Sequence, residues 1–328
     1  MSFDVDDMHN LEKYKIAEEK LKRYKEILNL HKLSDENYVE YLGQRLIILI
    51  SSKCNTKCKH CYISYEGSRD PNELFEMINL LKDKYIIELN GAEILTNLGY
   101  LKSYKLLGQH FLISNGKAIL DNPLTIEKLK ENEITTVSLS YHFGIQDKIS
   151  AVSFDYLNQI IDTLHRNDIE VRLMTTINSD NYNSILNMCD NALLLGARAI
   201  KFTNYISQGN ALNLDDNNKL TNYQKKIFFE QLDIARQIYD KYDLLIERCG
   251  TFGKNSNLQK DHFQCVCIEN SVVLTPDNNI YPCIFLAKPG YEIGKYVNGK
   301  ILLLKDLHID NDKCLSDEVC NKVYKIYK

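Results

Sequence analysis

The sequence lacks three features that would assign it to common classes of protein. No apolar run approaches the ~20 residues of a membrane-spanning helix, and residues 46–50 are among the longest. The formal net charge is -4, without the basic excess of a protein that binds nucleic-acid phosphates. The N-terminus, MSFDVDDMHN, is acidic and has no apolar stretch behind it, unlike a secretory signal. We therefore expect a cytoplasmic protein whose partners are neither membranes nor nucleic acids.

The overall composition excludes disordered and fibrous chains. Hydrophobic residues make up 44% of the 328 residues and charged residues 26%, which are ordinary values for a globular protein. The length suits one large domain or two unequal ones. Ten cysteines are present, and in a chain without a signal they favour metal binding or catalysis over disulfides.

Residues 1–44 are expected to form an N-terminal helical extension. Apolar residues recur there at steps of three and four, which is typical of one stripe on a charged helix: Tyr14, Ala17, Leu21, Tyr24 and Leu28. Our interpretation is a helix packed across the main domain, and a partner-binding helix is the alternative.

From residue 45 onward, short β-rich runs alternate with helical stretches at about 30 residues per unit. This alternation predicts parallel strands joined by right-handed crossovers. Six units are too few for a complete barrel of eight, so we expect an α/β fold with a partial (β/α)6 barrel over 45–245. Functional residues are expected at the C-terminal ends of its strands. The six runs are 45–50, 85–89, 110–114, 135–140, 170–176 and 198–203.

Residues 246–328 are expected to form a small C-terminal α+β domain, a β-hairpin plus a helix, rich in cysteine. Six of the ten cysteines lie between Cys249 and Cys320. The stretch VVLTPDNNIYPC predicts the hairpin, because Asn278 tolerates the left-handed backbone of a tight turn.

The first cysteine cluster follows the first predicted strand. Cys54, Cys58 and Cys61 lie in CNTKCKHC, where one tight loop can present three thiolates to one point. A [4Fe–4S] cluster has four irons, so three ligands leave one iron open to a substrate or cofactor. The aromatic Tyr62 would shield such a cluster from water. A zinc site that includes the adjacent His60 is an alternative, and so is a chance grouping of thiols.

This loop resembles the signature of the radical S-adenosylmethionine (AdoMet) superfamily, and two further motifs extend the resemblance over about residues 45–250. The stretch ELNGAEIL resembles the family's Gly-Gly-Glu-Pro loop, and SNGK resembles its Thr-Asn-Gly turn. The resemblance implies that the ELNGAEIL loop holds the amino group of AdoMet. The matching positions are Gly91, Ala92, Glu93 and Ile94 in the first motif, and Ser114, Asn115 and Gly116 in the second.

The resemblance also implies a chemistry. AdoMet would chelate the open iron through its amino and carboxylate groups. One electron from the cluster, reduced by a flavodoxin- or ferredoxin-type donor, would cleave AdoMet to methionine and a 5′-deoxyadenosyl radical. Further AdoMet contacts are expected from inward-facing strand residues, namely Ser140 and Arg172. Arg172 would pair with the AdoMet carboxylate, and its alternative position is at the base of the strand.

The C-terminal cysteines resemble the family's SPASM and twitch extensions. Fifteen residues separate Cys267 from Cys283, and Asn278 stands where those extensions have glycine. We therefore expect one auxiliary [4Fe–4S] cluster, with zinc or plain buried thiols as alternatives. Its expected ligands are Cys267, Cys283, Cys314 and Cys320, with Cys249 and Cys265 as rivals.

Three other features complete the expected site. Cys265 is a weak candidate for a catalytic thiol that donates hydrogen to a product radical. Cys189, alone in a helical stretch, is expected in the core. The stretch GNAL, residues 209–212, resembles a Gly-Arg-Ala element of SPASM enzymes.

The resemblance implies a peptide-modifying enzyme that forms a crosslink, a thioether or an epimer in a ribosomally made peptide. A dehydrogenase or rearrangement enzyme acting on a sugar, cyclitol or nucleotide is the alternative, and a non-enzymatic iron–sulfur electron carrier is a remote one. The 44 residues before the first strand are too few for a winged-helix leader-peptide domain, and no cobalamin domain is expected.

Overall fold

The computed structural model of the protein describes residues 38–214, 218–249, 252, 267 and 270–305, with the backbone of two short strands at 307–310 and 323–326. Residues 1–37 of the predicted N-terminal helical extension lie outside the described residues, and Tyr38–Glu40, at its end, form a strand instead of a helix. No helix among those described is long and apolar enough to cross a membrane.

Seven parallel strands form the frame of the fold, in two hydrogen-bonded ladders. The first ladder joins β2 (Arg45–Leu49) to β3 (Ile86–Asn90). The second runs in the order β4-β5-β6-β7-β8. Its strands are β4 (Phe111–Ser114), β5 (Thr136–Ser140), β6 (Glu170–Ile177), β7 (Ala199–Asn204) and β8 (Leu245–Arg248).

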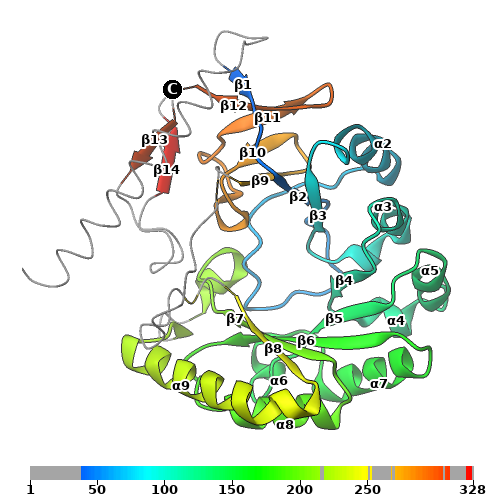
Figure 1. The fold of residues 1–328 in the computed structure, drawn as a ribbon, viewed down its shortest axis with the longest axis vertical. Helices are drawn as coiled ribbons and strands as arrows, with labels where there is room; N and C mark the ends of the chain where they lie inside the picture. The colour runs from blue at the N-terminus through cyan, green and yellow to red at the C-terminus, as the bar shows by residue number, and fades with distance from the viewer. Residues whose placement is uncertain are drawn as a thin grey trace, which may run out of the picture.

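This arrangement confirms the mixed α/β class, and each of the six predicted runs is a strand. The seventh strand, β8, extends beyond residue 245, where we placed a domain boundary. The two ladders are not hydrogen-bonded to one another between β3 and β4. Figure 1 shows the strands following an arc with the helices on its outer side. The inner side of the arc is called the concave face below, and the partial barrel stays a prediction.

At the start of two of the longer helices, a side chain satisfies free backbone N–H groups. Asp70 accepts from the N–H groups of Asn72 and Glu73 at the start of α2, and Pro71 occupies its first turn. Thr221 and Gln224 form a capping box at the start of α9. The longer helices are α2 (Pro71–Leu81), α7 (Phe154–His165), α8 (Ile185–Leu194) and α9 (Asn222–Tyr239). The shorter ones are α3 (Leu101–Leu106), α4 (Lys117–Asp121), α5 (Thr125–Glu131) and α6 (Gln146–Ile149).

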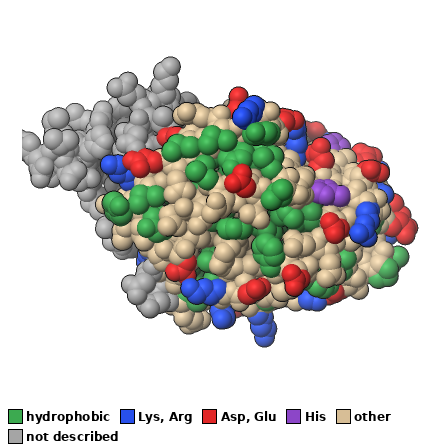
Figure 2. All heavy atoms as spheres, turned by 90° about the horizontal axis from the view of Figure 1, so that it is seen from below, with side chains coloured by type: hydrophobic (Ala, Val, Ile, Leu, Met, Phe, Trp, Pro, Cys, Tyr) green, Lys and Arg blue, Asp and Glu red, His purple; other side chains and the backbone are tan. Residues whose placement is uncertain are grey.

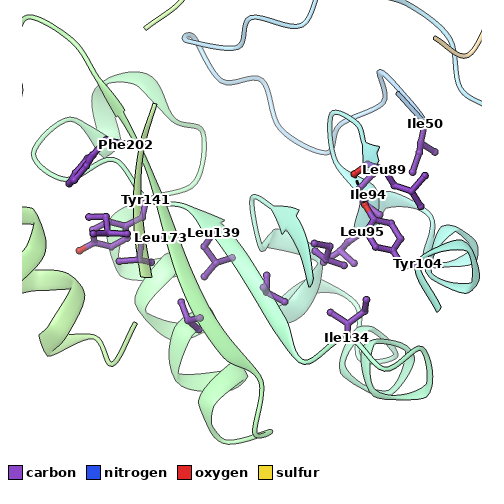
Figure 3. Packing of buried hydrophobic residues seen from close by; sticks show 14 of the residues in the cluster. Ile50, Leu89, Ile94, Leu95, Tyr104, Ile134, Leu139, Tyr141, Leu173 and Phe202 are labelled. Carbon is purple, nitrogen blue, oxygen red and sulfur yellow. Dashed lines mark hydrogen bonds between the residues drawn. The ribbon is translucent and has the colours of Figure 1, made fainter. Parts of the chain in front are cut away.

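The core lies between the strands and the helices. Alternate residues of each strand point to the helix side, as the period of two in a strand requires. Leu139, Leu173 and Phe202 come from three neighbouring strands and are at most 1% exposed (Figure 3). Full burial of one such side chain stabilises the fold by about 1.5–3 kcal/mol. The residues between them, such as Arg172 and Lys201, are half-buried and belong to the concave face.

The C-terminal strands extend the ladder of β2. Strand β9 (Ser271–Leu274) pairs in parallel with β2 and antiparallel with β10 (Asn279–Tyr281), which confirms the predicted hairpin. Antiparallel pairing then continues through β11 (Gly294–Val297) and β12 (Lys300–Leu304) to β1 (Tyr38–Glu40). Strands β13 (Leu307–Asp310) and β14 (Val323–Ile326) pair separately. The predicted division into three domains stays a prediction.

A buried arginine joins the hairpin to the segment that precedes α2. Arg69 is only 6% exposed, and its Nη1 donates to Asn278 Oδ1 at 3.0 Å. Its Nη2 donates to the Thr275 carbonyl at 2.9 Å. Asn278 itself has a φ of 69°, which confirms the left-handed turn expected from the sequence. One residue therefore both forms the turn and accepts a hydrogen bond from the buried cation.

We predict that Asn278→Ala destabilises the protein more than Asn278→Gly. Both variants lose the acceptor for Arg69, a charged hydrogen bond that contributes about 1.5–3 kcal/mol. Only alanine also strains the left-handed backbone, which adds about 1 kcal/mol. Urea unfolding of the two variants and the wild type measures these differences. Equal stabilities of the alanine and glycine variants would contradict the prediction.

Candidate functional site

The candidate site lies where the strands β2, β3 and β4 end. The cysteine loop, residues 54–61, follows β2 and crosses the inside of the arc, where Figure 1 draws it as a light-blue trace. The loop after β3 contains Gly91, Ala92 and Glu93, while Ser114 is the last residue of β4 and Asn115 follows it. Parallel strands bring their C-terminal ends to one edge, so the three predicted motifs share that edge.

The three thiols of the cysteine loop lie around a common hydroxyl and a short backbone turn. Thr56 Oγ1 lies 3.1 Å from Cys54 Sγ and 3.7 Å from Cys58 Sγ. The Cys61 N–H donates to the Cys58 carbonyl at 3.4 Å. Burial raises the pKa of the Cys61 thiol, and the neighbouring Cys58 and Cys54 thiols act in the same direction.

Each of the three sulfurs also has a hydrogen-bond donor from its own chain. Asn115 Nδ2 donates to Cys54 Sγ at 3.6 Å, and the Ala151 N–H donates to Cys58 Sγ at 3.4 Å. The backbone of Ile63 makes a hydrogen bond that lowers the pKa of Cys61, opposing its burial. Donors directed at sulfur stabilise the thiolate, the form that binds iron.

The spacing of the three thiols bears on the kind of metal centre that the loop could hold. Among the described residues, no group of three or more His, Cys, Asp or Glu side chains is spaced for one metal ion. His60, the additional ligand considered for zinc, has other partners: its Nδ1 lies 3.0 Å from the Ile149 carbonyl oxygen, and its ring lies against that of His142. A cluster, by contrast, binds each cysteine through a separate iron and so uses thiols that stand further apart.

Glu93 ties the loop after β3 to the turn after β4. Its Oε1 accepts from Ser114 Oγ at 2.8 Å and from the Leu95 N–H at 3.1 Å. Its Oε2 accepts from the Asn115 N–H at 2.7 Å. Burial to 1% exposure raises the pKa of the carboxyl in spite of these three donors. The sequence did not indicate this bridging role, and the contact between Glu93 and AdoMet stays a prediction.

The backbone of the first motif is held against the end of β2. The Ala92 N–H donates to the Ser51 carbonyl at 2.8 Å, and the Gly91 N–H donates to Asn90 Oδ1 at 2.9 Å. Asn115 then reaches across to the cysteine loop, where its Nδ2 donates to Asn55 Oδ1 at 2.9 Å. All three motifs are thus connected by hydrogen bonds.

The loop after β7 packs directly on the cysteine loop. Gln208 donates to Ser64, Asn210 Nδ2 donates to the Cys58 carbonyl at 3.2 Å, and the Ala211 N–H donates to the Cys61 carbonyl at 3.3 Å. Gly209 has a φ of 59°, and a Cβ there would lie 2.7 Å from the Cys61 carbonyl oxygen. GNAL, noted in the sequence only as a weak resemblance, is therefore a support of the site.

Tyr62 connects the cysteine loop with the C-terminal part of the chain. Its ring meets that of Phe285 edge to face at a centroid distance of 5.3 Å. Burial raises the pKa of Tyr62 to about 12, and Cys61 and Cys249 add to the effect. Phe285 lies in the short helix η7 (Ile284–Leu286), directly after Cys283.

The predicted auxiliary ligands are only partly described. Cys267 forms a parallel bridge with Ser271, and Cys283 begins η7. Cys265, Cys314 and Cys320 lie outside the described residues, so the auxiliary cluster stays a prediction. Cys189 is fully buried in α8, as expected for a core residue.

The structure does not bring Arg172 to the cysteine loop. Its Nη2 bonds to Glu247 Oε2 at 2.6 Å. It lines a cavity of about 880 Å³ where the strands β4 to β8 begin, at the end opposite the cysteine loop. Ser140, in contrast, is the last residue of β5 and pairs with Met174, toward the end that carries the site.

Comparisons with known proteins identify the fold. No protein-family model and no curated protein matches the chain. Several solved structures do. SuiB of Streptococcus suis bound to S-adenosylmethionine aligns with a TM-score of 0.60 at 15% identity, over 77% of this chain and 63% of SuiB. SuiB bound to its precursor peptide SuiA aligns with a TM-score of 0.60 at 15% identity, over 85% and 66%.

A third similar structure is anSMEcpe with bound AdoMet and the Cp18Cys peptide. It aligns with a TM-score of 0.58 at 17% identity, over 77% of each chain. The chain spans slightly less than two thirds of AdoMet-bound SuiB. At these identities the likeness establishes a shared fold.

We predict that Gly209→Ala is much more destabilising than Gly108→Ala. Gly108 has a similar φ of 61°, but a Cβ there meets nothing within 4 Å. Both variants strain the backbone by about 1 kcal/mol, and the clash at Gly209 adds about 1–3 kcal/mol. Urea unfolding measures both free energies. Equal losses would show that the loop after β7 does not pack tightly on the cysteine loop.

We predict that Glu93 makes stability fall as the pH rises above about 4.5, its ordinary pKa. Because burial raises its folded-state pKa, the folded protein keeps a proton there that the unfolded chain has already released. Glu93→Gln lacks this titration, so its stability relative to the wild type should improve with pH across that window. Urea unfolding between about pH 4 and pH 8 tests this. Parallel profiles for the two proteins would contradict it.

Proposed function

We propose that the protein is a radical AdoMet enzyme. The observation that carries this proposal is the arrangement of Cys54, Cys58 and Cys61 at the end of β2, each sulfur with a hydrogen-bond donor. The hydrogen bonds of Glu93 and Asn115 link this loop to the ends of β3 and β4. The shared fold with AdoMet-bound SuiB and anSMEcpe supports the same conclusion.

In this proposal the three cysteines hold a [4Fe–4S] cluster, and one iron remains for AdoMet. The cluster and AdoMet together supply a 5′-deoxyadenosyl radical, formed by one-electron cleavage, that abstracts hydrogen from the substrate. The remaining site residues of this chain bind and orient AdoMet. They are Tyr62, Gly91, Ala92, Glu93, Asn115 and Ser140.

The chain's own residues also control access to the site. The contact between the Tyr62 and Phe285 rings would shield the cysteine loop from water on the side of the C-terminal segment. Asn115 and Thr56 orient the Cys54 sulfur, and Glu93 fixes the backbone that carries Asn115. A radical reaction needs this exclusion of water and fixed geometry, because a loose site admits side reactions.

The substrate that we propose is a ribosomally made peptide. SuiB has been solved with its precursor peptide SuiA. The enzyme anSMEcpe has been solved with the peptides Cp18Cys and Kp18Cys. In this chain a peptide would approach the concave face, where half-buried residues such as Met174, Lys201 and Thr203 lie. The reaction would be a crosslink, a thioether or an epimerisation.

We further propose one auxiliary [4Fe–4S] cluster in a twitch-like C-terminal region, with Cys267, Cys283, Cys314 and Cys320 as its ligands. A flavodoxin or ferredoxin would supply the electrons. The contact between Tyr62 and Phe285 supports this arrangement, since Phe285 lies two residues after Cys283 and Tyr62 directly follows Cys61.

We predict about eight irons per chain after anaerobic reconstitution, and about four in a variant with Cys54, Cys58 and Cys61 changed to alanine. Iron and sulfide analysis measures both values. About four irons in the wild type and none in the variant would contradict the auxiliary cluster but support the AdoMet site. No iron in the wild type would overturn the proposal.

The same preparations separate an enzyme from an electron carrier. With AdoMet and dithionite, the reconstituted wild type should form 5′-deoxyadenosine and the cysteine variant should form none. If the protein with its cluster neither binds nor cleaves AdoMet, the proposal that it is a radical AdoMet enzyme is contradicted. Cleavage stimulated by a sugar, cyclitol or nucleotide, with no response to peptides, would contradict the peptide substrate.

A further inference from the structure

A short segment at the end of α6, residues 149–151, makes four contacts with the cysteine loop. The Ile149 carbonyl lies 2.9 Å from the Lys59 N–H and 3.0 Å from His60 Nδ1. The Ala151 N–H donates to Cys58 Sγ at 3.4 Å, and Ser150 Oγ lies 3.9 Å from the same sulfur. Three consecutive residues thus hold both the backbone and one thiol of the loop.

The segment is fixed from behind by a buried glutamine. Gln146 is 3% exposed, and its Oε1 accepts from the His142 N–H at 2.7 Å. Its Nε2 donates to the Val152 carbonyl at 2.7 Å. His142 is in turn fixed to β6, because its Nδ1 accepts from the Thr176 N–H at 3.0 Å. The position of residues 149–151 is therefore set by the parallel sheet.

A hydrogen bond to a cluster-ligating sulfur has a defined electronic effect. Reduction adds negative charge to the cluster and its sulfurs, and a directed N–H dipole stabilises that charge. The donor therefore raises the reduction potential and retards loss of the ligand. A backbone N–H held by surrounding structure does this without reorganisation, because it does not rotate away as a hydroxyl can.

We propose that residues 149–151 are a positioning element that tunes the cluster through Cys58, with the Ala151 N–H as its donor and Gln146 as its support. This inference depends on the proposed function, because it assumes that Cys58 ligates an iron. It assigns no catalytic residue: the segment acts on the sulfur and has no contact with the reacting atoms. The expected consequence of this element is a higher reduction potential of the cluster than the three thiolates alone would give.

The decisive variant is Ala151→Pro, which removes this one N–H group. Ser150 has φ −95° and ψ 153°, an extended conformation that suits a residue before proline. Ala151→Gly is the matched control, because it changes the same side chain and retains the donor. EPR-monitored redox titration of the reconstituted proteins gives the potential of the cluster. Chelator-driven loss of iron gives its retention.

We expect the proline variant to have a more negative potential and to lose iron faster than the wild type, and the glycine variant to match the wild type. Equal potentials in the proline variant and the wild type would overturn the inference and leave the proposed function intact. An equal shift in both variants would also overturn it, since the donor would not be the cause. A wild type that takes up no cluster would overturn both.

A second variant keeps the test decisive if the proline protein does not fold, as judged by circular dichroism. Gln146→Met has a similar volume but removes both hydrogen bonds that support the segment. A negative shift in its potential would support the inference. An unchanged potential in a folded Gln146→Met protein would overturn it.

Discussion

The site depends on a carboxylate that spans a gap in the sheet. Strands β3 and β4 share no ladder, yet Glu93 after β3 accepts from Ser114 and Asn115 at the end of β4. Burying an ionised carboxylate is costly unless donors satisfy it, and three donors do so here. The Ala92 N–H also donates to the Ser51 carbonyl, which joins the ends of β2 and β3. The hydrogen bonds of Glu93 therefore fix the loops after β2, β3 and β4 relative to one another.

The cysteine loop itself has no regular secondary structure, and its shape comes from its neighbours. Asn115 holds it from the end of β4, and the 149–151 segment holds it from the far end of α6. The glycine-containing loop after β7 contacts the carbonyls of Cys58 and Cys61. A functional loop supported by rigid strands in this way can present three thiols at fixed positions without a ladder of its own.

The sequence predicted the strands and the motif loops because both depend on local patterns. Short β-rich runs that alternate with helical stretches located β2 to β7, and spacing located the cysteines. It did not predict that β9 extends the ladder of β2, because strand pairing between distant segments leaves no local signal. The same limit explains Arg172: alternation shows which face it shares with Met174, but not which end of β6 it serves. The sequence did not indicate that residues 149–151 contact the cysteine loop. Most of these contacts are made by backbone atoms, and residue type carries no information about backbone contacts.

The pairing of β9 with β2 also explains how two cysteine-containing segments far apart in sequence come to one place. Parallel pairing aligns Ser271 with Arg45, and antiparallel β10 runs back beside β9. Phe285, two residues after Cys283, then meets Tyr62, which directly follows Cys61. This ring contact therefore joins the cysteine loop, which follows β2, to the segment that follows the C-terminal hairpin.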